Sequence, residues 1–135
     1  MKKVFENKFV VMYLDEENKL LNDVWAKTSA NLSTQQFKEI MYEWRDLVIT
    51  NQVKLALLDT REMKFMIDPD LQHWIATEIN APAQQHGLIK VANLLPPSVF
   101  EQVSIQQTLD EMKAVNDFTS KVFKDESEAK SWLFS

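Results

Sequence analysis

A single glycine, Gly87, is the feature of this 135-residue chain that most restricts its fold and chemistry. The glycine-rich loops that bind nucleotide phosphates, G-x-x-x-x-G-K-[ST] and G-x-G-x-x-G, need several glycines and are therefore excluded. The G-x-S-x-G nucleophile elbow is excluded for the same reason. Because few turns with positive φ can form, we expect long regular elements joined by Asp, Asn and Pro.

The composition is typical of one globular domain covering residues 1–135. Hydrophobic residues make up 45% and charged residues 26%, so a sizeable core can be buried. The net charge of −5, from 20 acidic and 15 basic residues, argues against nucleic-acid binding. A chain without cysteine has no disulfide, thiolate nucleophile or cysteine metal site. No apolar run approaches roughly 18 residues and residues 1–7 lack a signal-peptide pattern, so we expect a cytoplasmic protein with no membrane span and no cofactor.

The amino-terminal region predicts an antiparallel hairpin. Apolar residues alternate over 9–14, an acidic turn cluster follows, and residues 19–26 form the returning strand. In the returning strand Leu21 and Trp25 share one side. Residues 4–5 would add a short strand before the hairpin.

The clearest helix lies at residues 34–50. Ser33 followed by Gln36 has the spacing of a capping box, and apolar residues then recur at i, i+3, i+4 and i+7. Trp44 lies on this apolar stripe, which favours core packing over an aromatic binding platform.

Strands and helices alternate through the rest of the chain. The apolar run 53–58 is typical of a strand covered on both faces, and Asp68 with Pro69 begins a second helix that Pro82 breaks or kinks. The later predicted elements are a strand at 88–95, a helical region from Ser98 to about Met112, a strand at 118–123 and a terminal helix capped by Asp125. The order predicts an α/β fold: an N-terminal β-hairpin, then alternating helices and strands in a mixed sheet with parallel members.

The sequence assigns no catalytic or metal-ligating residue. His73 and His86 are the two histidines, and a proline-interrupted helix lies between them, so they do not form a metal pair. We expect structural or surface roles for both. Most carboxylates belong to turns or helix starts. An enzyme would need a site assembled from residues that no motif connects.

Asp59 stands out among the carboxylates because it follows the strand predicted to be central. Ligands usually bind at the carboxyl ends of strands in open α/β sheets. Asp59 either contacts a ligand or orders the following loop, paired with Arg61. The apolar residues Met63, Phe65 and Met66 either plug this end of the sheet or line a pocket or partner surface. The sequence leaves both choices open.

Several groups of residues, spread over nearly the whole chain, match the pattern of a known protein family. They are Val24-Trp25, Leu58-Asp59-Thr60-Arg61-Glu62-Met63, Asp68-Pro69-Asp70 with Trp74-Ile75, Pro82 with Gly87-Leu88, Leu95-Pro96 with Val99-Phe100, and Val122-Phe123-Lys124-Asp125 with Ala129 and Trp132-Leu133. In order and spacing they resemble the STAS superfamily (sulphate transporter and anti-sigma-factor antagonist domains), in its small stand-alone, SpoIIAA-like bacterial branch. The resemblance implies a four- to five-stranded mixed sheet with helices mainly on one face.

The resemblance also implies a regulatory function. The superfamily contains non-enzymatic switches and ligand-sensing modules, and its fold is similar to that of the CRAL-TRIO lipid carriers. In the antagonist proteins a strand-end Asp is followed nine or ten residues later by Asp-Ser-Ser-Gly, where a phosphorylated serine breaks the complex with a kinase. Asp59 matches the strand-end Asp, but Asp68-Pro69-Asp70 offers no hydroxyl and no glycine. This chain therefore departs from the phosphoserine switch.

We expect a non-enzymatic regulatory or protein-interaction module that binds a protein partner or a second copy of itself. The alternative is a small apolar or lipid-like ligand in a pocket at the sheet end near Asp59. The residues expected to carry either function are Asp59, Thr60, Arg61, Met63, Phe65, Met66, Asp68, Asp70 and Trp74.

Overall fold

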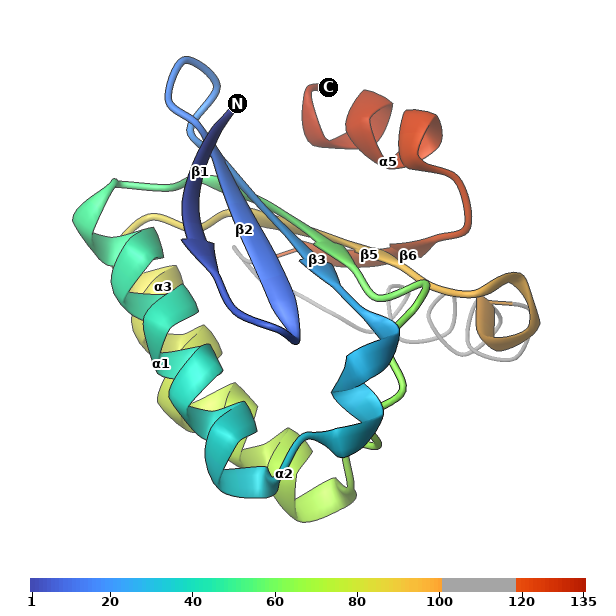
Figure 1. The fold of residues 1–135 in the computed structure, drawn as a ribbon. Coiled ribbons are helices and arrows are strands. Elements are labelled where there is room, and N and C mark those ends of the chain that lie inside the picture. The colour runs from blue at the N-terminus through green and yellow to red at the C-terminus, as the bar shows by residue number, and fades with distance from the viewer. Residues whose placement is uncertain (101–118) are drawn as a thin grey trace.

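The computed structural model describes residues 1–100 and 119–135 and arranges them around one β-sheet (Figure 1). The sheet has six strands, in the order β1-β2-β3-β4-β5-β6. The strands are β1 (Lys2–Glu6), β2 (Val10–Asp15), β3 (Leu20–Trp25), β4 (Leu55–Asp59), β5 (Lys90–Leu94) and β6 (Thr119–Phe123).

The sheet is mixed. β1, β2 and β3 are antiparallel neighbours, whereas β3, β4, β5 and β6 run parallel. The predicted hairpin and α/β class are confirmed, and the strand predicted to be central lies between β3 and β5. The expectation of four to five strands is wrong. The short strand suggested by Val4 and Phe5 extends over residues 2–6 and forms one edge of the sheet, and both side chains pack against the core.

Helical segments cover both faces of the sheet. They are η1 (Lys27–Asn31), α1 (Thr34–Thr50), α2 (Pro69–Trp74), η2 (Ile75–Asn80), α3 (Ala81–Gln85) and α5 (Glu126–Leu133). α1 and the continuous α2–η2–α3 segment lie on one face, and α5 lies on the other, against β4, β5 and β6 (Figure 1).

The alternation of side chains along β4 divides the core into two layers. Ala56 belongs to the layer beneath α1, whereas its neighbours Leu55 and Leu57 pack with Ala129 and Leu133 of α5. Successive side chains of a strand point to opposite faces of the sheet. β4 is therefore buried on both sides, as its nearly unbroken apolar sequence predicted.

α1 begins with the predicted capping box. The Ser33 hydroxyl accepts the N–H of Gln36 at 3.1 Å, and Oε1 of Gln36 accepts the N–H of Ser33 at 2.9 Å. The helix then buries Phe37 and Trp44 against the sheet. Because the cap fixes where the helix begins, it also fixes which side chains of α1 face the sheet.

At Pro82, where the sequence predicts a break or a kink, the helical segment is continuous and passes through the π-helical segment η2. The N–H of Ala81 bonds to the carbonyl of Ala76, five residues earlier. Pro82 has no N–H for the carbonyl of Glu78, and that carbonyl instead accepts a hydrogen bond from Nη1 of Arg45 at 3.3 Å. A side chain of α1 thus compensates for the proline.

The later elements also follow the predicted order. Gly87 adopts a φ of 115° after α3, and Oδ1 of Asp125 caps α5 by accepting the N–H of Glu128 at 3.0 Å. Of the helix predicted from Ser98 to about Met112, the part up to residue 100 is helical and the remainder lies outside the described residues. None of the helices in residues 1–100 and 119–135 combines the length and apolar character that crossing a membrane requires.

Candidate functional site

The residues singled out from the sequence lie in three places rather than one. Asp59 and Arg61 are on the α5 face of the sheet, next to Glu126. Thr60 and Met63 line a cavity on the α1 face. The others follow along the β4–α2 connection and α2; they are Phe65, Met66, Asp68, Asp70 and Trp74.

Asp59 and Arg61 form a two-pronged ion pair. Nε of Arg61 donates to Oδ1 at 2.9 Å and Nη2 donates to Oδ2 at 2.7 Å. The backbone N–H of Arg61 also donates to Oδ1, at 3.2 Å. These hydrogen bonds from Arg61 to Asp59 raise the pKa of the guanidinium above its ordinary value. The buried carboxylate of Asp59 is therefore occupied by its own loop.

The apolar cluster of the β4–α2 connection is divided between several environments. Met63 lines the cavity, as does Thr60. Phe65 stacks on Phe37 with ring centroids 4.8 Å apart and belongs to the core. Met66 is 86% exposed and points away from the core.

The residues expected in α2 lie outside the cavity lining. Asp68 caps the helix, and its Oδ1 accepts the N–H of Leu71 at 2.8 Å. Asp70 is exposed in the first turn. Trp74 is half-buried and meets Tyr42 edge-on, with ring centroids 5.4 Å apart.

The two histidines are also absent from the cavity lining. Both are exposed, and Nδ1 of His86 lies 2.8 Å from the carbonyl oxygen of Pro82, at the end of its own helix. Within residues 1–100 and 119–135, no group of three or more His, Cys, Asp or Glu side chains is placed to hold a metal ion.

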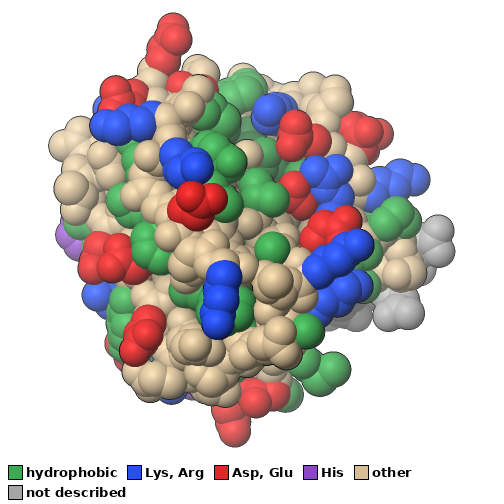
Figure 2. Space-filling view, viewed as in Figure 1, with side chains coloured by type: hydrophobic (Ala, Val, Ile, Leu, Met, Phe, Trp, Pro, Cys, Tyr) green, Lys and Arg blue, Asp and Glu red, His purple; other side chains and the backbone are tan. Residues whose placement is uncertain are grey.

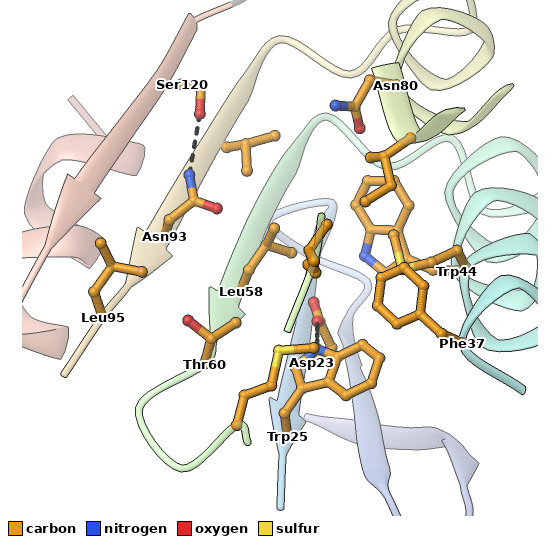
Figure 3. A pocket seen from close by; sticks show the side chains of 15 residues that line it. Asp23, Trp25, Phe37, Trp44, Leu58, Thr60, Asn80, Asn93, Leu95 and Ser120 are labelled. Carbon is orange, nitrogen blue, oxygen red and sulfur yellow. Dashed lines mark hydrogen bonds between the residues drawn. The ribbon is translucent and has the colours of Figure 1, made fainter. Parts of the chain in front are cut away.

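A cavity of about 330 Å³ lies between the sheet and the helices α1 and η2 (Figure 3). Residues near the carboxyl ends of β3, β4 and β5 contribute to its lining, which is where ligands bind in open α/β sheets. Most of the lining is apolar and includes Trp25, Phe37, Met41, Leu58, Ile75 and Val91.

Asp23 is the one ionisable side chain that lines the cavity in the described part of the chain. It is only 3% exposed. Nε1 of Trp25 donates to its Oδ2 at 2.7 Å, whereas its Oδ1 has no hydrogen-bond partner among the described residues. The pKa of Asp23 is raised to about 7, chiefly by burial; the N–H groups of Trp25 and Trp44 oppose the rise, and the negative charge of Asp59 adds to it.

Trp44 places a second buried polar group beside Asp23. Its indole N–H lies close enough to lower the pKa of the carboxyl, yet it forms no hydrogen bond with any residue that the structure describes. Figure 3 shows the nitrogen edge of Trp44 turned toward Asp23 from α1. A buried donor or acceptor without a partner costs about 1–3 kcal/mol of stability. Two such groups belong to side chains that line the same cavity, so this part of the core contains unsatisfied hydrogen-bonding capacity.

Polar side chains mark another part of the cavity lining. Nδ2 of Asn93 donates to the Ser120 hydroxyl at 3.0 Å (Figure 3), and Ser120 is exposed.

Ile75 and Asn80, at the two ends of η2, both line the cavity. A π turn holds more residues than an α turn, so residues five apart come to the same side. The π segment thus places Asn80 at the site.

The sequence-based reasoning missed Asp23. A usable signal was present, because Asp23 stands between Leu21 and Trp25, which share the core-facing side of the predicted strand. An acid flanked at i−2 and i+2 by core residues is a buried acid, and buried charges are normally paired. The sequence assigned Trp44 to the core correctly but did not indicate that its N–H lacks a partner.

The arrangement is suited to binding. Among the described lining residues, no histidine, lysine or arginine accompanies Asp23 to form an acid–base pair.

On the outer surface, Figure 2 shows basic and acidic side chains interspersed over the face that carries β1 and α1. Opposite charges largely offset one another there, in contrast to the single carboxyl group inside the cavity.

Comparisons with known proteins name no relative of this chain: no protein-family model, no curated protein and no solved structure matches it. The functional interpretation therefore depends on the chemistry of the site itself.

Proposed function

We propose that this chain is a non-catalytic binding domain that holds a small, largely apolar ligand in the cavity between the sheet and α1. The observation that carries the proposal is the buried carboxyl of Asp23, a residue that lines the cavity and whose Oδ1 has no partner among the described residues. A carboxyl group that titrates near neutral pH in an apolar cleft is a common feature of functional sites.

The volume of the cavity sets the size of the ligand. A cavity of about 150 Å³ accommodates benzene. In proportion, the cavity of about 330 Å³ accommodates roughly a dozen non-hydrogen atoms. A bicyclic aromatic molecule or a medium-length aliphatic chain has this size.

The domain is proposed to be a divergent STAS-like module in which ligand binding serves regulation. The amino-terminal hairpin followed by alternating helices and parallel strands supports this proposal. The occurrence of ligand-sensing modules among the STAS domains that the sequence resembles supports it as well. The absence of a hydroxyl in Asp68-Pro69-Asp70 favours a ligand, rather than phosphorylation, as the regulatory input.

A second candidate function is the docking of a protein partner, or of a second copy of the chain, on the β4–α2 connection. Met66 would supply an apolar contact for such a partner, because its side chain is 86% exposed. The exposed carboxylate of Asp70 lies nearby in the sequence. This surface and the cavity share the β4–α2 connection through Met63, so the two functions are compatible.

The substitution Leu58→Trp tests the ligand-binding function. Leu58 is a half-buried residue of β4 that points into the cavity (Figure 3), so a larger side chain fills the space available to a ligand. We expect 2-naphthol to bind the wild-type chain and to raise its melting temperature, and we expect Leu58→Trp to abolish both effects. Met66→Trp introduces the same side chain outside the cavity and serves as the matched control.

Binding is measured by calorimetric titration, and native mass spectrometry of protein purified from bacterial cells looks for a co-purified small molecule. Equal binding by the wild type, Leu58→Trp and Met66→Trp would place the ligand elsewhere. If bicyclic compounds do not bind the wild type and no mass co-purifies, the proposed function is wrong.

A further inference from the structure

The chemistry of the cavity restricts the polar group of its ligand, an inference that rests on the proposed function. Two buried polar atoms of residues that line the cavity have no partner among the described residues, namely Oδ1 of Asp23 and Nε1 of Trp44. They come from β3 and α1, and their proximity shows in the effect of the Trp44 N–H on the carboxyl. One atom accepts a hydrogen bond and the other donates one.

A hydroxyl group fits this pair because one oxygen can donate to Oδ1 and accept from the indole N–H at the same time. An ammonium group only donates, so it would leave the N–H of Trp44 unpaired. An ionised carboxylate only accepts, and it would bring a further negative charge beside Asp23, whose carboxyl already experiences the charge of Asp59. A hydroxyl is a neutral group that satisfies both atoms through one oxygen.

A water molecule has the same hydrogen-bonding capacity and is the natural occupant when no ligand is bound. A ligand hydroxyl that takes the position of this water keeps both hydrogen bonds. It also brings an apolar body against Trp25, Phe37, Met41 and Val91, which line the same cavity. Burial of that body supplies the affinity that a water lacks.

We propose that the cavity binds a neutral alcohol or phenol whose apolar body has roughly a dozen non-hydrogen atoms, scaled from the volume that benzene occupies, and whose hydroxyl bridges Asp23 and Trp44. The hydroxyl orients the ligand, and the aromatic and aliphatic lining contacts the rest.

A matched series of bicyclic probes tests the inference on the whole chain. The probes are naphthalene, 2-naphthol, 2-naphthylmethylamine and 2-naphthoic acid, which share one apolar body and differ in the polar group. We expect 2-naphthol to bind about tenfold more tightly than naphthalene, as two net hydrogen bonds imply, and more tightly than the amine or the acid. The indole N–H resonance of Trp44 is expected to shift with 2-naphthol and much less with naphthalene.

Trp44→Phe removes the indole donor and keeps an aromatic ring in the cavity. It is expected to reduce the advantage of 2-naphthol over naphthalene to less than threefold. Trp74→Phe, at a tryptophan outside the cavity lining, is the matched control and is expected to leave every affinity unchanged. If Trp44→Phe fails to fold, the wild-type affinities and the Trp44 resonance still decide the question.

The outcomes separate this inference from the proposed function. If no probe binds, the ligand-binding function itself fails. If naphthalene and 2-naphthol bind equally and the Trp44 resonance does not respond, the cavity binds apolar ligands but the hydroxyl bridge is refuted. Stronger binding of the amine or the acid would refute the hydroxyl class in favour of the corresponding charged group.

Discussion

Replacing Asp23 by asparagine should change how the stability of the protein depends on pH. Burial raises the pKa of this carboxyl from 3.8 to about 7. An acid whose pKa is raised by folding binds more protons in the folded state than in the unfolded state between these two values. The free energy of unfolding therefore falls as the pH rises through this window and stays low above it. Asparagine does not titrate, so the variant lacks this contribution.

The size of the effect follows from the two pKa values. One pH unit between them is worth about 1.4 kcal/mol. The carboxylate thus lowers the stability of the wild type by up to about 4 kcal/mol between pH 3.8 and about 7. Asparagine keeps an acceptor for the N–H of Trp25. We expect the two proteins to be similarly stable near pH 4 and the Asp23→Asn variant to be more stable at pH 8, by up to the same amount.

Urea unfolding of both proteins at several pH values between 4 and 8, followed by circular dichroism, measures this difference. Other carboxyl groups titrate in both proteins, so the difference between the two curves isolates Asp23. Asp70→Asn makes the same substitution at an exposed position and should run parallel to the wild type. If the wild-type and Asp23→Asn curves also run parallel from pH 4 to 8, Asp23 is not a buried carboxyl of raised pKa.

Two further substitutions address the other predicted site residues. Arg61→Ala should lower the free energy of unfolding by about 1–3 kcal/mol, because it leaves the buried carboxylate of Asp59 without its main donor. It should leave the binding of 2-naphthol unchanged, since the Asp59–Arg61 pair lies on the α5 face of the sheet. A melting temperature equal to that of the wild type would contradict this structural role. Met66→Glu should change the stability by less than about 0.5 kcal/mol and dissociate any dimer that sedimentation detects. A dimer that survives the substitution would show that Met66 is not part of its interface.

Local hydrogen bonding and periodicity explain why much of the fold could be predicted. The capping box of Ser33 and Gln36 and the caps of Asp68 and Asp125 involve residues three apart, and the structure contains all three. Likewise, the nearly unbroken apolar run before Asp59 predicted a strand covered on both sides. Such features depend on neighbours in the chain, so the sequence displays them directly.

Compensation between distant residues could not be predicted in this way. The helical segment continues past Pro82 because η2 widens into a π turn and because Arg45, on another helix, donates to the carbonyl of Glu78. No local pattern around Pro82 reveals that a donor will lie there. The wrong expectation of four to five strands came from the family resemblance. The residues themselves suggested six strands, including the short one at residues 4–5 that the structure contains as β1.

Residue patterns alone predict the order of the elements, the helix caps, the hairpin and the central position of β4. The folded arrangement was needed to see that Asp59 is paired within its own loop and that Asp23 and Trp44, 21 positions apart, are unpaired neighbours at a cavity. The physical reason is that secondary structure arises from interactions between near neighbours. Cavities and unpaired polar atoms depend on how side chains from separate strands and helices fill the space between them.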